Sequence, residues 1–142
     1  MSGVPPVTLV VDCANVVGSR PDGWWRDRVG ATARLLGQLA GLPGQALLPG
    51  PDGADLHLAA VVAVVEGRSR PVEEPEGVRV IRAEADGDTA VVEAARQVIA
   101  AGGVPLVVTA DRGLRARLDA GAVVTGPRWL LALLALLDAH QP

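Results

Sequence analysis

Five acidic residues follow apolar segments that have the composition of buried β-strands. Asp12 follows VTLVV, Glu66 follows AAVVAVV, Asp86 and Asp88 follow RVIRAE, and Asp111 follows PLVVTA. Carboxylates packed together repel and raise one another's pKa unless a cation lies among them. Such oxygen ligands suit Mg²⁺ or Mn²⁺, which can activate an attacking water and neutralise charge on a scissile phosphate. We therefore expect a metal site formed by Asp12, Asp86, Asp88, Asp111 and Glu66.

Each acid also has a structural interpretation that needs no metal. Asp88 precedes Thr-Ala-Val and Asp111 precedes Arg-Gly-Leu, so either could be only the N-cap of a helix. Asp12 could simply make an Asx turn after its strand. Because several strand ends supply acids together, we expect Asp12, Asp88 and Asp111 to share one site, whereas Asp86 and Glu66 could lie inside or outside it.

The segments that must position these acids alternate between strand-like and helix-like patterns. Continuous apolar runs rich in β-branched residues predict buried strands, and a helical apolar period predicts helices. The expected strands are 7–11, 58–65, 78–81, 105–109 and 122–125, and the expected helices are 25–40, 89–101, 112–120 and 127–140. Residues 41–53, rich in Gly and Pro, are expected to be irregular, and 68–77 an extended crossover without a good helix.

This alternation predicts an α/β fold with a mainly parallel central sheet of about five strands and helices on both faces. In such folds ligands bind beyond the carboxyl ends of the strands, where the strand order reverses. The acids stand at those ends, so the sheet would gather them at one edge. A length of 142 residues is typical of one compact domain, and we expect residues 1–142 to form one.

Other polar residues near the acids suit orientation or phosphate binding. Asn15 is the only asparagine, and its amide can fix a turn or a water beside Asp12 without adding charge. Arg112 directly follows one of the acids and could contact a substrate phosphate or pair with an acid. Asp22 and Asp27 could add an outer carboxylate, although Asp27 equally suits the first turn of a helix.

The segment after the first strand also carries aromatic and basic residues. Trp24 adjoins Arg26 and lies near Arg20, so an indole could stack on a base while the arginines hold phosphates. The alternative is that a tryptophan packs under the helix that it precedes. We expect one of the pair Trp24 and Trp25 to be buried and the other exposed.

Composition excludes several function classes. The single cysteine, Cys13, excludes an internal disulfide, and the absence of lysine excludes a Schiff base and a P-loop lysine. The net charge of -3 argues against binding nucleic acid by bulk charge, although a local arginine patch could hold phosphates. The N-terminal MSGVPP has no signal-peptide pattern, and the longest apolar run is far short of a membrane span. We expect a cytoplasmic protein with no membrane contact.

Four segments taken together resemble the NYN domains of PIN-like nucleases. VVDCANVVGS resembles their D-x-x-N signature, EG at 66–67 their strand-end acid-Gly, ADGDTAVV their A-D-D-x-I-V segment, and VVTADRGLRARL their T-x-D-R-x-L segment. The resemblance covers roughly residues 7–125. It implies a three-layer PIN-like, Rossmann-like fold and metal-dependent cleavage of RNA, with Asp12, Asp88 and Asp111 as metal-binding acids. It also implies that Asn15 orients the first loop or a water.

Three positions depart from the NYN pattern. Cys13 replaces the usual glycine, Glu66 replaces the usual aspartate, and Gly87 separates Asp86 from Asp88. The resemblance therefore leaves the identity of the third metal ligand open.

Our leading hypothesis is a Mg²⁺- or Mn²⁺-dependent endoribonuclease that acts on RNA through a metal-activated water. The alternatives are a small-molecule phosphohydrolase resembling NTP pyrophosphohydrolases, built on the same acids, and a non-catalytic RNA-binding module. The apolar stretch Leu130 to Leu137 could be buried beneath the sheet or form a dimer contact, so both a monomer and a homodimer are compatible with the sequence.

Overall fold

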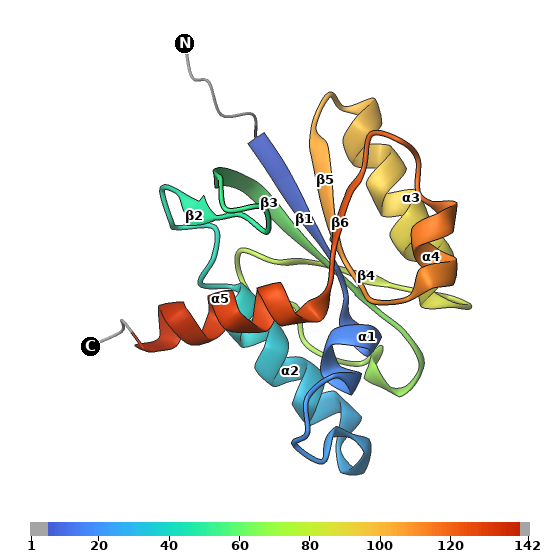
Figure 1. The fold of residues 1–142 in the computed structure, drawn as a ribbon. Helices are drawn as coiled ribbons and strands as arrows, with labels where there is room; N and C mark the ends of the chain where they lie inside the picture. Colours follow the sequence, from blue (N-terminus) through green and yellow to red (C-terminus); the bar gives the residue numbers. More distant parts are fainter. Residues whose placement is uncertain (1–5, 140–142) are drawn as a thin grey trace.

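The computed structural model describes residues 6–139, which form one six-stranded sheet with helices packed against it (Figure 1). Five strands are parallel and lie in the order β4 (Arg79–Arg82), β3 (Asp55–Val65), β1 (Pro6–Asp12), β5 (Val104–Val108) and β6 (Val123–Thr125). The sixth strand, β2 (Leu48–Pro49), pairs antiparallel with the start of β3. After β1, the chain adds β3 and β4 on one side of β1 and then β5 and β6 on the other side, so the strand order reverses at β1. The prediction of a mainly parallel α/β sheet is confirmed.

Strand β3 contains an irregularity that changes which of its side chains face the helices. Val7 of β1 pairs with Leu58 and the next residue, Thr8, pairs with Ala60, so one extra residue of β3 lies between them. A regular strand alternates its faces every residue, and an extra residue shifts that alternation. As a result Leu58 and Val61, three positions apart, belong to the same hydrophobic cluster.

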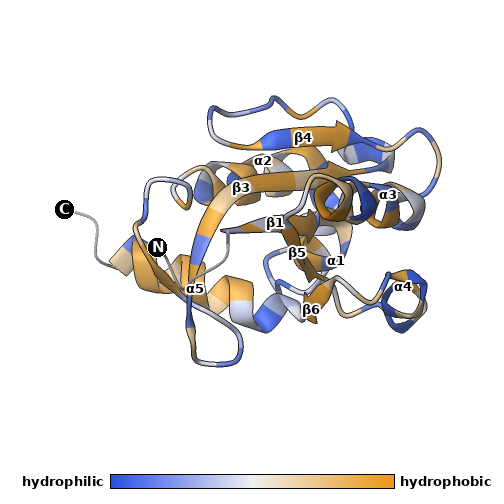
Figure 2. Ribbon diagram, turned by 90° about the horizontal axis from the view of Figure 1, so that it is seen from above, coloured by the Kyte–Doolittle hydropathy of each residue, from blue (hydrophilic) through white to orange (hydrophobic). Residues whose placement is uncertain are grey.

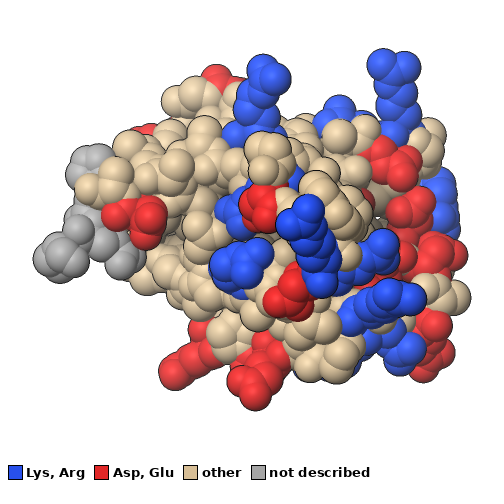
Figure 3. Space-filling model, turned by 90° about the horizontal axis from the view of Figure 1, so that it is seen from below, with Lys and Arg blue, Asp and Glu red and all other residues tan. Residues whose placement is uncertain are grey.

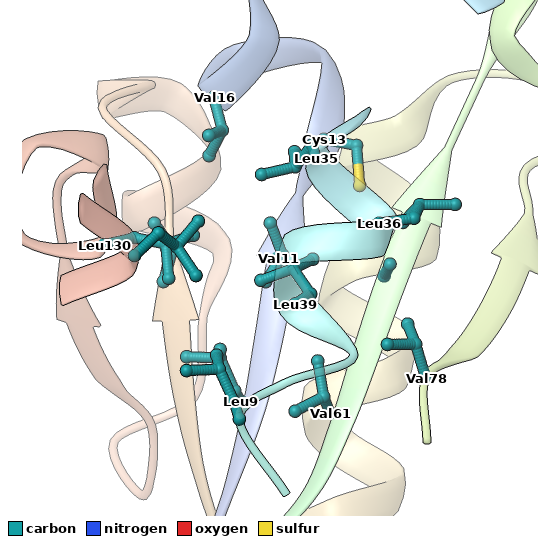
Figure 4. Packing of buried hydrophobic residues seen from close by; sticks show 14 of the residues in the cluster. Leu9, Val11, Cys13, Val16, Leu35, Leu36, Leu39, Val61, Val78 and Leu130 are labelled. Carbon is teal, nitrogen blue, oxygen red and sulfur yellow. The ribbon is translucent and has the colours of Figure 1, made fainter. Parts of the chain in front are cut away.

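Helices cover both faces of the sheet and make three layers. One cluster of buried residues joins the sheet to α1 (Cys13–Gly18), α2 (Arg28–Leu39) and α5 (Pro127–Ala139), and a second joins it to α3 (Gly87–Ala100) and α4 (Arg112–Arg117). Figure 2 shows the hydrophobic strands lying between these helices. In the first cluster, Leu35 and Leu39 of α2 pack against Leu9 and Val11 of β1, beside Leu130 of α5 (Figure 4).

The apolar stretch on α5 is largely accounted for by this packing. Leu130, Leu133 and Leu134 are buried beneath the sheet, while Leu136 is 48% exposed. Whether the protein forms a dimer stays a prediction. None of the helices within the described range has the length and apolar character needed to cross a bilayer.

Several boundaries differ from the sequence prediction. The helix expected from residue 25 begins at Arg28, because Asp27 caps it by accepting a hydrogen bond from the Gly30 N–H at 2.9 Å. Residues 24–26 form a separate 3₁₀ turn, η1 (Trp24–Arg26). The segment 41–53 was expected to be irregular but contributes β2, and β3 begins at Asp55 rather than at residue 58. Helix α4 ends at residue 117 instead of 120, and α1 was not expected. Segment 68–77 lacks a long helix, as predicted, and only η2 (Gly67–Ser69) enters it. Residue 140 lies outside the described residues.

Candidate metal-binding site at the strand ends

Acidic residues lie at the carboxyl end of the sheet, on both sides of the point where the strand order reverses. Strand β1 ends at Asp12, and its neighbour β5 is followed by Thr109, Ala110 and Asp111. Asp111 is the N-cap of α4, since its Oδ1 accepts a hydrogen bond from the Leu114 N–H at 3.0 Å. The structural interpretation of Asp111 as a cap is therefore correct, and its position beside β1 is also the one that a shared site requires.

Thr109 links the two strand ends through its hydroxyl group. Its Oγ1 donates a hydrogen bond to Oδ2 of Asp12 at 2.8 Å and accepts one from the Asp111 N–H at 3.1 Å. Thr109 is 0% exposed and Asp12 only 5%. The guanidinium of Arg115 donates two hydrogen bonds, of 2.7 and 3.1 Å, to the Thr109 carbonyl oxygen, so the residue is held at both its backbone and its side chain.

Neither Thr109 nor Arg115 was predicted to have a role in this site. The available signal for Thr109 was its place as the threonine of the segment that resembles T-x-D-R-x-L, at the end of a buried strand. No local signal points to Arg115, because its contact with the Thr109 carbonyl depends on how α4 folds back on the strand end.

Asn15 lies on the same side of the crevice as Asp12 and reaches across to the loop after β5. Its Oδ1 accepts a hydrogen bond from the Ala110 N–H at 2.8 Å. Because α1 begins immediately after Asp12, this bond ties the first turn of α1 to the residue between Thr109 and Asp111. Within residues 6–139 no group accepts a hydrogen bond from the Asn15 side-chain N–H₂ group, which leaves it available to a ligand.

Two of the three positions that depart from the NYN pattern, Glu66 and Gly87, contact each other. Oε2 of Glu66, which follows β3, accepts a hydrogen bond from the Gly87 N–H at 2.9 Å, at the start of α3. A Cβ atom at position 87 would lie only 2.6 Å from Glu66 Oε1, so a side chain there would displace the carboxylate. The longer acid therefore occupies space that glycine leaves open at the helix terminus.

The N-cap suggested at Asp88 lies two residues earlier, at Asp86, because α3 begins at Gly87 rather than at residue 89. The cap of α3 is Asp86, whose Oδ1 accepts a hydrogen bond from the Thr89 N–H at 2.7 Å, whereas Asp88 lies within the first turn. The Thr89 hydrogen bonds hold the pKa of Asp86 below its usual value. Arg117 donates a hydrogen bond to Thr89 Oγ1 at 3.1 Å, and its charge favours the ionised forms of both acids.

Burial and mutual repulsion act on the remaining acids. Burial raises the pKa of Asp12, the Thr109 hydroxyl and the Asn15 backbone amide oppose that rise, and the charges of Asp88 and Glu66 add to it. Desolvation likewise raises the pKa of Asp88, followed by the charges of Asp111, Asp86 and Glu66. The ionised form of Asp12 is therefore disfavoured by burial and by nearby carboxylates, and a bound cation would offset both effects.

These carboxylate oxygens are ligands of the kind that a hard divalent cation prefers, and within residues 6–139 no basic side chain forms an ion pair with any of the five acids. Among residues 6–139 the only ion pair joins Arg96 and Asp119, at 3.3 Å. In the described part of the chain, no group of three or more His, Cys, Asp or Glu side chains is arranged to hold a metal ion. Mg²⁺ is usually bound by one or two carboxylates and several waters, so the arrangement suits few direct ligands. Metal binding stays a prediction.

The residues expected to bind substrate lie mostly along the connection from α1 to α2. Trp25 is 58% exposed with Arg26 over its ring, whereas Trp24 is partly buried against the core, with Arg28 over its ring. The expected division is confirmed only in part, because Trp24 is half-buried rather than buried. The more exposed indole, and so the one better placed to stack on a base, is Trp25 rather than the expected Trp24. Arg20 donates a hydrogen bond to Gln38 Oε1 at 2.7 Å.

The structure does not join this segment to the acids. Across residues 6–139 no hydrogen bond or ion pair connects Arg20, Trp24 or Arg26 to an acidic residue of the site. Arg112 is exposed at the start of α4, beside Asp111. Figure 3, which views this end of the molecule, shows arginines distributed among acidic side chains rather than in one continuous basic patch. Cys13 is fully buried, and burial raises the pKa of its thiol, so it is not suited to act as a nucleophile.

The three layers, the parallel sheet and the acids beyond its carboxyl edge define a PIN-like α/β fold. The structure is similar to a crystal structure of a mutant of Rae1 (YacP) from Bacillus subtilis, with a TM-score of 0.62 and 19% sequence identity. The match covers 93% of this chain and 76% of the Rae1 chain. At this identity the likeness shows a shared fold. No protein-family model matches the sequence, and no curated protein gives a match.

Proposed function

We propose that this protein is an endoribonuclease of the NYN type that hydrolyses RNA phosphodiester bonds with the help of Mg²⁺ or Mn²⁺. The observation that carries the proposal is the buried carboxylate of Asp12 at the reversal of strand order, with its pKa raised by burial and by the nearby acids Asp88 and Glu66. The PIN-like fold and the four sequence segments that resemble NYN domains support the same function.

In this proposal the carboxylate of Asp12 would hold the cation directly, and Asp88 and Asp111 would contact it through bound waters. When bound, the cation would supply a more acidic water and neutralise charge on the scissile phosphate. The chain's own residues do the positioning. Thr109 fixes one oxygen of Asp12 by its hydrogen bond of 2.8 Å. Asn15 holds the loop after β5 against α1 and presents its N–H₂ group for a phosphate oxygen or a water.

The test compares hydrolysis of single-stranded RNA and of nucleoside triphosphates in EDTA, Mg²⁺ and Mn²⁺. We expect RNA cleavage that requires the added metal and is lost in Asp12→Asn and Asp88→Asn, which remove charge while keeping the side-chain shape. Asp119→Asn is the matched control, because Asp119 pairs with Arg96 on the exposed surface away from these acids. It should cleave like the wild type.

Two results would refute the proposal and favour another function. Triphosphate hydrolysis without RNA cleavage would favour the small-molecule phosphohydrolase. Metal-independent RNA binding without cleavage would favour the non-catalytic RNA-binding module. No feature of the described residues specifically favours the phosphohydrolase or the non-catalytic module.

A further inference from the structure

A groove opens directly beside the acidic site, between α1 and the first half of α5. It has a volume of about 880 Å³, and its lining includes Asn15 and Ala110, the two residues joined by a hydrogen bond of 2.8 Å at the edge of the site. Ala110 stands between Thr109 and Asp111, so the groove and the acids share a wall. A polymeric ligand bound across the acids would therefore extend into this groove.

The lining of the groove differs chemically from the site beside it. None of the described residues that line it is acidic, whereas Pro127 and Leu131 give it apolar surface and Arg128 gives it a cation. No group within residues 6–139 forms an ion pair or hydrogen bond with the Arg128 guanidinium. A volume of this size matches that of pockets that hold small organic ligands, roughly 300–1,000 Å³.

These features fit one kind of occupant. A ribonucleotide offers a flat apolar base and an anionic phosphate, which match an apolar wall and an arginine. The acids would repel phosphates that are not neutralised by a cation, so the chain on either side of a scissile phosphate needs a surface without carboxylates. The groove provides such a surface in contact with Asn15.

We propose that this groove binds the single-stranded RNA segment next to the scissile phosphate, with Arg128 contacting a backbone phosphate and Leu131 and Pro127 supporting a base or ribose. The inference rests on the proposed function and names where its substrate lies. It adds Arg128, for which no role was predicted from the sequence, to the residues that determine RNA affinity.

Two variants test the groove, each with a matched control. Arg128→Ala removes the cation, and its control is Arg34→Ala, an exposed arginine of α2 that lines a different cavity. Ala132→Leu fills the groove from α5, and its control is Ala135→Leu, an exposed position on the same helix outside the groove. Thermal unfolding of all four variants checks that each one folds.

The first readout is equilibrium binding of a fluorescent single-stranded RNA to proteins that also carry Asp12→Asn, so that no cleavage occurs. Arg128→Ala should weaken binding several-fold and reduce the slope of log affinity against log salt concentration by about 0.7, the value for one lost phosphate contact. Ala132→Leu should also weaken binding, whereas both controls should match the parent protein.

The second readout is cleavage, where Arg128→Ala should raise KM with little change in kcat. RNA shortened until it no longer reaches the groove should lose its sensitivity to this substitution. If Arg128→Ala and Ala132→Leu bind RNA like their controls, the groove proposal is overturned, even if the wild type cleaves RNA. If the wild type does not cleave RNA, the nuclease proposal fails and the binding measurement still decides the groove.

Discussion

Replacing Thr109 with valine would remove one hydroxyl group from the buried end of β5 and leave the side-chain volume nearly unchanged. The lost hydrogen bond joins Oγ1 to Asp12 Oδ2 at 2.8 Å, between residues that are 0% and 5% exposed. Hydrogen bonds to charged groups contribute roughly 1.5–3 kcal/mol. The Asp111 N–H also loses its acceptor, but Asp111 is only half-buried and water can replace the hydroxyl.

We therefore expect Thr109→Val to lower the free energy of unfolding at neutral pH by about 2 kcal/mol. For a chain of this length that corresponds to a fall in Tm of about 6 to 8 °C. The measurement is urea denaturation and thermal unfolding of the metal-free protein. Thr109→Ser is the control, because it keeps the hydroxyl and loses only a buried methyl group, worth about 1 kcal/mol.

The pH dependence gives a second check on the same hydrogen bond. Burial raises the folded-state pKa of Asp12 above 3.8, so the folded state keeps this proton to higher pH than the unfolded state does. The contribution of Asp12 to stability therefore falls as pH rises from 3.8 through the raised folded value. The Thr109 hydrogen bond opposes this rise, so the pKa of Asp12 should be higher still in the valine variant. The pH range over which stability falls should therefore extend to a higher pH in that variant than in the wild type.

Two outcomes would refute this reasoning about Thr109. One is an equal loss of stability in the valine and serine variants at neutral pH. The other is a valine effect that does not shrink as the pH approaches 3.8, where Asp12 becomes neutral and its hydrogen bond weaker.

Three further substitutions test the site around Thr109. Asp12→Asn should leave the metal-free protein equally or more stable than the wild type. In the wild type, free metal at about 100 times its dissociation constant should raise the free energy of unfolding by about 2.7 kcal/mol, and the variant should lose most of that gain. If metal does not stabilise the wild type, metal binding is contradicted. Gly87→Ala should displace Glu66 and lower stability by about 1 kcal/mol, whereas Gly37→Ala, where a Cβ meets nothing within 4 Å, should raise it, both measured by urea denaturation. Asn15→Ala should reduce stability and metal affinity, measured by calorimetry, and an unchanged protein would disprove its role.

The sequence was sufficient to find the acids but not to assign each one its local partner. Asp86 and Asp88 are two residues apart before the same helix, and either could cap it by type. The backbone places Asp86 at the cap and Asp88 in the first turn. Glu66 bonds to Gly87 only because β3 and the start of α3 meet, which neither segment shows alone.

Strand and helix positions were predictable because they depend on the side-chain pattern of neighbours in the chain. The runs around Val7 to Val11 and Leu106 to Val108 are apolar at nearly every position, and this pattern is sufficient for buried strands. The extra residue near Ala59 was not predictable, since either alternation of β3 would bury apolar residues.

The sequence by itself determined the fold class and the presence of acids at the ends of several strands. Only the tertiary structure decided that β1 and β5 are neighbours, that Thr109 bonds to Asp12 across 97 positions, and that Arg128 borders a groove next to Asn15. The physical reason is that local periodicity is fixed by a few residues, whereas the pairing of strands and the meeting of distant side chains depend on how all segments together bury their apolar faces.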